Sequence, residues 1–114
     1  MLDYLRAAAL TLAVEVPVYT MGLRALVDVP PARAAVAGVA VNAVTHPLAF
    51  LVVTPLLTGA AGPTGTLVAV EIGAWAVETA LLAVWLRRDV AVLTALSFVA
   101  NALSLAAGLA WLRP

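Results

Sequence analysis

The sequence predicts an all-α integral membrane protein: a four-helix bundle, up-down-up-down, forming a single transmembrane domain over residues 1–114. Its composition is 65% hydrophobic and only 11% charged, and its mean hydropathy is +1.11. A soluble domain is roughly 45–50% apolar and about 25% charged, so a soluble core could not hide this apolar surface. In addition, four apolar stretches, each near the roughly 20 residues that cross a bilayer as a helix, cover almost the whole chain.

Breaks in the apolar pattern separate the four predicted spans. These spans cover approximately residues 5–27, 32–57, 66–86 and 90–112. Pro30 and Pro31 cannot continue the first helix, whereas Pro31 suits the first turn of the second. A glycine-rich linker, residues 58–65, separates the second and third spans. The connection at residues 87–89 is so short that the third and fourth spans must be antiparallel neighbours, with Asp89 as N-cap.

Composition and charge exclude several classes of function. Because the chain has no cysteine, it has no disulfide, thiolate metal site, iron–sulfur cluster or thiol nucleophile. The net charge is zero, since six arginines balance six acidic residues, which argues against nucleic acid as a partner and against a polybasic lipid anchor. The lipid bilayer is the predicted partner, and the sequence leaves open a homo-oligomer or a larger membrane complex.

The arginines predict an orientation in the cell membrane. Four of them flank the first and third loops, and two lie on the other side: Arg24, Arg33, Arg87 and Arg88, against Arg6 and Arg113. Cytoplasmic loops carry an excess of positive charge. We therefore expect a multi-pass protein with loops 1 and 3 in the cytoplasm and both termini outside.

Every predicted span carries its most costly polar residue near its midpoint. A charged side chain that faces lipid at this depth costs about 2.5–3.5 kcal/mol on insertion scales. Helical spacing places the polar and small residues of each span on one face. The four faces are Thr11, Glu15 and Gly22; Gly38, Asn42, Thr45 and His46; Glu71, Trp75 and Glu78; and Thr94, Ser97, Asn101, Ser104 and Gly108. Turning all four faces inward predicts one polar cluster inside the bundle.

This cluster is the candidate site. We expect four of its residues to bind an ion or a proton: Glu15, His46, Glu71 and Glu78. The supporting residues would be Asn42, Thr45, Ser97, Asn101 and Ser104, with Asn42 orienting His46 from one turn away. Pro17 and Pro47 each free a backbone carbonyl near the same depth, and such breaks are tolerated where the backbone lines a cavity. Trp75, between the two glutamates of its span, is interpreted as a packing residue.

The first class of function that fits this cluster is cation handling. One histidine and three glutamates form a hard ligand set that suits zinc, manganese or iron(II), at Glu15, His46, Glu71 and Glu78. The same groups could pass protons, or bind an organic cation in exchange for them. The structural alternative is that protonated carboxyls only form hydrogen bonds between the helices.

Two other classes stay open. One is a non-catalytic subunit of a membrane complex, which fits a chain with almost no mass outside the bilayer. The other is an intramembrane hydrolase, in which His46 with Glu71 or Glu78 activates water, or Ser97 or Ser104 acts as nucleophile. The chain lacks His-Glu-x-x-His and Gly-x-Ser-x-Gly motifs. The sequence therefore leans against an enzyme.

Two resemblances accompany this interpretation. Glu15 in the context Ala13-Val14-Glu15-Val16, together with chain length and span count, resembles small multidrug resistance transporters over the first span. That resemblance implies a glutamate that binds protons and cationic drugs competitively; Asn42-x-x-Thr45-His46-Pro47 and the two later glutamates depart from that family. The full pattern is similar to a group of uncharacterised small four-span bacterial and archaeal membrane proteins. It consists of Glu15-x-Pro17, Asn42-x-x-Thr45-His46-Pro47, Glu71 with Glu78, and Ser97-x-x-x-Asn101-x-x-Ser104, and it implies the fold and the site but no activity.

Overall fold

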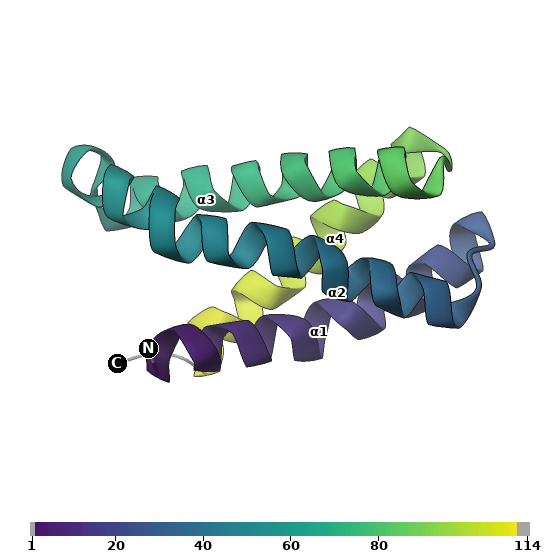
Figure 1. Ribbon diagram of the computed structural model, residues 1–114. Coiled ribbons are helices and arrows are strands. Elements are labelled where there is room, and N and C mark those ends of the chain that lie inside the picture. Colours follow the sequence, from purple (N-terminus) through teal and green to yellow (C-terminus); the bar gives the residue numbers. More distant parts are fainter. Residues whose placement is uncertain (1, 112–114) are drawn as a thin grey trace.

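A computed structural model describes residues 2–111, and these residues are almost entirely helical, with no strand among them. The elements are α1 (Leu2–Val27), α2 (Pro31–Pro47), a π-helical segment (Leu48–Val53), α3 (Thr54–Leu86) and α4 (Val90–Trp111). Figure 1 shows them in chain order. The predicted all-α class is confirmed. Leu112, the expected end of the last span, and Arg113 lie outside the described residues.

The predicted linker at residues 58–65 is wrong in its extent, because among these residues only Gly62 departs from helical geometry. Over Pro31–Leu86 the helical segments follow one another without a gap, so the described chain has three separate helices instead of four. The chain reverses direction within this stretch at Gly62, whose backbone (φ 73°, ψ 174°) is accessible almost only to glycine. Figure 1 shows α3 returning alongside α2. Glycine costs only about 1 kcal/mol relative to alanine within a helix, so Gly59 and Gly65 are tolerated in helical turns. The reversal therefore needs only the backbone of Gly62.

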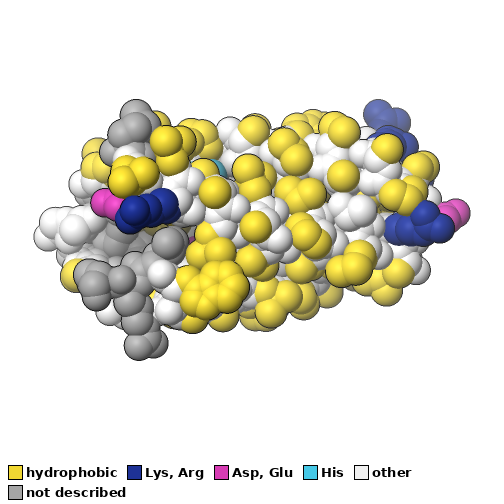
Figure 2. Space-filling view, turned by 90° about the horizontal axis from the view of Figure 1, so that it is seen from below, with side chains coloured by type: hydrophobic (Ala, Val, Ile, Leu, Met, Phe, Trp, Pro, Cys, Tyr) yellow, Lys and Arg dark blue, Asp and Glu magenta, His cyan; other side chains and the backbone are white. Residues whose placement is uncertain are grey.

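The reversal at Gly62 gives the chain four helical arms. α1 packs against α2 and α4, and α3 packs against α4 and, less extensively, α2. The molecule measures 42 × 23 × 19 Å. The length of its long axis matches the thickness of a bilayer with its headgroups, which is about 40–45 Å. Three helices, counting Pro31–Leu86 as one, are long and apolar enough to cross a membrane. Apolar side chains cover the flank seen in Figure 2, and the charged side chains visible there lie near the two ends.

The tightly packed core fills the half of the molecule next to the two short loops. Its buried apolar residues are Tyr19, Leu23, Val29, Ala34, Ala37, Val41, Leu82, Leu86, Leu93, Leu96 and Ala100. Glycines let the arms approach closely here: a Cβ on Gly22 would lie 2.4 Å from Leu96 Cδ1, and one on Gly38 would lie 3.3 Å from Tyr19 Cβ. Side chains therefore close this half of the molecule, and the main cavity lies in the other half.

Polar contacts fix the helix ends at the closed half. Arg88 Nε donates a hydrogen bond of 2.9 Å to the Val27 carbonyl, and its Nη1 donates one of 2.9 Å to the Leu86 carbonyl. One side chain thus satisfies the last carbonyls of both α1 and α3. Asp89 Oδ1 accepts a hydrogen bond of 2.9 Å from the Ala91 amide, which confirms Asp89 as the N-cap of α4.

Candidate functional site

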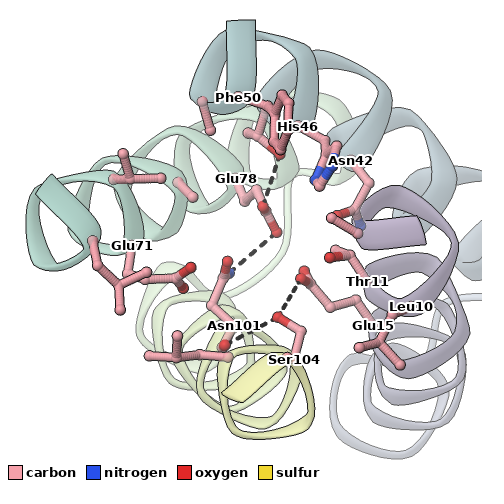
Figure 3. A pocket seen from close by; sticks show the side chains of 18 of the residues that line it. Leu10, Thr11, Glu15, Asn42, His46, Phe50, Glu71, Glu78, Asn101 and Ser104 are labelled. Atoms are coloured by element: carbon pink, nitrogen blue, oxygen red, sulfur yellow. Dashed lines mark hydrogen bonds between the residues drawn. The ribbon is translucent and has the colours of Figure 1, made fainter. Parts of the chain in front are cut away.

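A partly open cavity of about 280 Å³ lies in the half of the molecule away from the core. Polar residues from all four arms line it: Thr11, Glu15, Asn42, Thr45, His46, Thr54, Glu71, Glu78, Asn101 and Ser104. Figure 3 shows side chains of the four arms pointing into this one space. All four residues that the sequence singled out for ion or proton binding, Glu15, His46, Glu71 and Glu78, are brought together here.

Glu78 is the most fully hydrogen-bonded of the three carboxyl groups. Its Oε1 accepts hydrogen bonds from the Tyr19 hydroxyl (2.6 Å) and from Asn101 Nδ2 (3.2 Å), and its Oε2 accepts one from Thr45 Oγ1 (3.0 Å). Thr45 Oγ1 also lies 2.9 Å from the Val41 carbonyl, so its single hydroxyl proton has two acceptors within reach. Glu78 is 1% exposed. It therefore holds α1, α2 and α4 together through one buried group on α3.

Glu15 is equally buried but only half satisfied. Its Oε2 accepts a hydrogen bond of 2.7 Å from Ser104 Oγ, whereas its Oε1 is buried and has no hydrogen-bond partner. Leaving a buried polar atom unpaired costs about 1–3 kcal/mol, and more for a charged group. This oxygen has almost no accessible surface, and the Glu15 carboxyl lies within hydrogen-bond reach of the Glu78 carboxyl, so a proton on Glu15 would satisfy it and a cation would have to replace that proton.

Glu71 is a half-buried carboxyl on the cavity wall, two turns before Glu78 on α3. Within residues 2–111 its carboxyl makes no hydrogen bond. The charges of Glu15 and Glu71 both interact with that of Glu78, and Glu71 also acts on Glu15. Ionised carboxylates this close in a region of low dielectric repel one another, and a bound proton or cation relieves the repulsion.

His46 lies on the cavity wall between aromatic rings. Its ring is 5.2 Å from Tyr4 and 6.2 Å from Phe50, and its Nε2 is buried without a hydrogen-bond partner. The expected contact from Asn42 is not formed; Asn42 Nδ2 donates instead to the Gly38 carbonyl at 2.9 Å. An amide on the same helix reaches back to the carbonyl four residues earlier more readily than forward to a ring that aromatic contacts hold.

The backbone after His46 departs from α-helical geometry. Pro47 lacks the amide that would bond the Ala43 carbonyl, and a π-helical segment, Leu48–Val53, follows directly. π-helical turns are rare and are frequent at functional sites. Ala49 and Phe50, in this segment, line the cavity. The break that the sequence placed at Pro47 thus forms part of the cavity wall.

Tyr19 is the site residue that the sequence analysis missed. It is fully buried in the core, donates to Glu78 and lies 3.1 Å from Ser97 Oγ. It follows Glu15 by one helical turn, and this spacing was the available signal. Neither Tyr19 nor Ser97 lines the cavity itself. Trp75 packs against Phe98 (5.6 Å) and donates to the Thr94 carbonyl (2.9 Å), which confirms the packing interpretation.

The arrangement gives little support to hydrolysis or to a multidentate metal site. Ser104 donates to Glu15, and Ser97 lies beside Tyr19, so neither serine is paired with His46 in the described part of the chain. No three histidine or acidic side chains within residues 2–111 lie close enough together to hold a metal ion. The cavity is acidic, but its acidic groups do not converge as a ligand sphere does.

Comparisons of this chain with protein-family models, with curated proteins and with solved structures give no match.

Proposed function

We propose that the chain crosses the cell membrane as a four-helix bundle and that its central cavity binds or moves a proton or another small cation. The four arms between Leu2 and Trp111 would be the spans, with loops 1 and 3 in the cytoplasm. The cavity would then open towards the side that carries the termini. Glu15 is the binding group, and Glu71 and His46 share the cavity wall with it.

One observation carries this proposal: the buried, unpaired Oε1 of Glu15. Glu78 accepts hydrogen bonds from other helices at both of its oxygens, whereas Glu15 accepts one at Oε2 only and has its carboxyl beside that of Glu78. Three carboxyl groups around one cavity add charge that a cation would neutralise. Because ionisable groups at this depth are costly and by default functional, the unpaired oxygen supports a binding role over a structural one.

The test is proton release on cation binding. Purified protein in mild detergent and weak buffer would receive sodium, methylammonium, zinc or manganese chloride, each adjusted to the same pH. We expect at least one cation to release about one proton per chain from the wild type, because a proton and a cation compete for Glu15. The Glu15→Gln variant should release none.

A second measurement tests the case in which the cavity binds protons but no other cation. Infrared difference spectra over a pH titration should show a protonated carboxyl band that disappears in the wild type and is weaker in Glu15→Gln. If no cation releases protons and no carboxyl band titrates, the proposal fails. The polar cluster would then be structural, as in a subunit of a larger complex.

The orientation can be tested directly because the chain has no cysteine. Single cysteines at Asp28 (Asp28→Cys) and Asp3 (Asp3→Cys) would be exposed to a membrane-impermeant maleimide in intact cells. We expect labelling at position 3 only. Labelling at position 28 alone would reverse the orientation, and labelling at both would contradict a single topology.

A further inference from the structure

We infer that the cation taken by this cavity is a protonated primary or secondary amine with a short unbranched aliphatic arm, which lies in the cleft between α2 and α3. This inference rests on the proposed function and names the ligand class of the same site. Two groups of observations carry it: the polar groups left unsatisfied in the cavity, and an apolar cleft that continues it.

The unsatisfied groups call for a cation that donates hydrogen bonds. Glu15 Oε1 is buried and unpaired, and Glu71 on the facing arm makes no hydrogen bond within the described chain. An ammonium group can donate to both carboxyls, whereas a quaternary ammonium has no N–H and would leave Glu15 Oε1 unsatisfied. Quaternary ammonium ions are bound by cages of aromatic rings. Among the described lining residues only His46 and Phe50 supply rings, and these two stack on each other.

The size of the cavity argues for more than a bare ion. Its volume of about 280 Å³ would hold roughly nine water molecules at about 30 Å³ each. Small-molecule pockets begin at about 300 Å³, so the cavity approaches the lower end of that range. About half of its lining residues are alanine, leucine, valine, glycine or phenylalanine, which suit the carbon atoms of an organic cation rather than a hydrated metal ion.

The cleft supplies a place for the arm. A second, apolar cavity of about 130 Å³ lies between the α2 arm and α3, and it shares Thr45, Ala49, Val70 and Ala74 with the main cavity. Small side chains keep it open: a Cβ on Gly73 would meet no atom within 4 Å. Its volume matches about four groups of the size of a water molecule. A four-carbon arm would therefore fit here, with its ammonium head in the main cavity.

The experiment measures proton release against the concentration of a series of amine hydrochlorides: methyl-, ethyl-, propyl- and butylammonium, and butyltrimethylammonium. For the wild type, the half-maximal concentration should fall about fourfold with each added methylene, or roughly 60-fold from methyl to butyl. Butyltrimethylammonium should release no protons. These two results together would support a donating head and an apolar arm.

Matched variants locate the arm. Gly73→Leu fills the cleft with four carbons, so the gain with chain length should vanish while methylammonium still releases protons. Gly59→Leu is the control, because Gly59 lies on the same helix, also has no neighbour within 4 Å and lines neither cavity. Its half-maximal concentrations for proton release should equal those of the wild type. Any uptake of amine by the detergent is the same for both proteins and therefore cancels in this comparison.

Three outcomes would overturn the inference while leaving the proposed function intact. They are release with no dependence on chain length, an unchanged series in Gly73→Leu, and release by sodium, a metal ion or the quaternary ion in place of the amines. If no added cation releases protons, the inference also falls, and the infrared titration alone then decides the proposed function.

Discussion

The Tyr19 hydroxyl on α1 donates a hydrogen bond of 2.6 Å to Glu78 Oε1 on α3, across the centre of the molecule. These two arms pack mainly on α2 and α4 rather than on each other, so this hydrogen bond joins two arms that otherwise make little contact. Glu78 lines the cavity and Tyr19 belongs to the core, so the contact joins the two. A small group of polar atoms thus ties the arms together where the cavity meets the core.

Removal of the Tyr19 hydroxyl should destabilise the protein without emptying the core. In Tyr19→Phe the ring stays, but Glu78 loses its shortest hydrogen bond, which in a membrane protein is worth about 1 kcal/mol. Thermal unfolding in detergent would measure the loss. Tyr4→Phe is the matched control, because Tyr4 contacts His46 and Phe50 through its ring, and this variant should unfold as the wild type does. Equal effects of the two variants would contradict the bridging role.

Glu15 and Glu78 should respond in opposite ways to the same substitution. Glu15→Gln keeps an acceptor for Ser104 and leaves stability nearly unchanged, but it abolishes proton release. Glu78→Gln places an amide NH₂ among three donors, so it should cost about 1–3 kcal/mol. Thermal unfolding and proton release, measured on both variants, separate binding from structure. If Glu15→Gln unfolds as early as Glu78→Gln, Glu15 is a structural group.

Much of the site was predictable from the sequence because it depends on helical periodicity and on the cost of polar groups in lipid. Those two facts place Glu15, His46, Glu71 and Glu78 at one depth and on inward faces, and the structure gathers them at one cavity. What the sequence could not predict are the individual pairings. Which carboxyl receives the donors of Tyr19 and Thr45, and which keeps an unpaired oxygen, depends on side-chain packing across the bundle.

The fold shows the same division. The all-helical class and the helix boundaries at Pro31 and Asp89 follow from composition and capping chemistry. The connection between α2 and α3 does not follow from the sequence, because a glycine-rich segment is typical of a loop when lipid and packing are not considered. Only the backbone angles of Gly62 show that a single residue reverses the chain.

Metal analysis should find well under one zinc, iron or manganese ion per chain. No three acidic or histidine side chains converge within residues 2–111, and structural and catalytic metal sites need at least three protein ligands. The protein would be purified in mild detergent without chelator or His-tag and measured by mass spectrometry beside His46→Ala. Near-stoichiometric metal that disappears in His46→Ala would reverse this expectation and favour a metal cation at the site.

Gly62 should be the one glycine of the predicted linker whose backbone angles exclude a side chain. Its φ of 73° and ψ of 174° lie in a region essentially restricted to glycine, where another residue costs of order 1–3 kcal/mol. Gly62→Ala should therefore lower thermal stability even though a Cβ there would contact nothing. Gly59→Ala is the matched control: Gly59 is helical and equally free of neighbours, so alanine should stabilise the protein by up to about 1 kcal/mol. Opposite signs for the two variants in thermal unfolding would establish a single-residue reversal. Equal, small effects would mean that residues 58–65 form a flexible loop, as the sequence alone suggests.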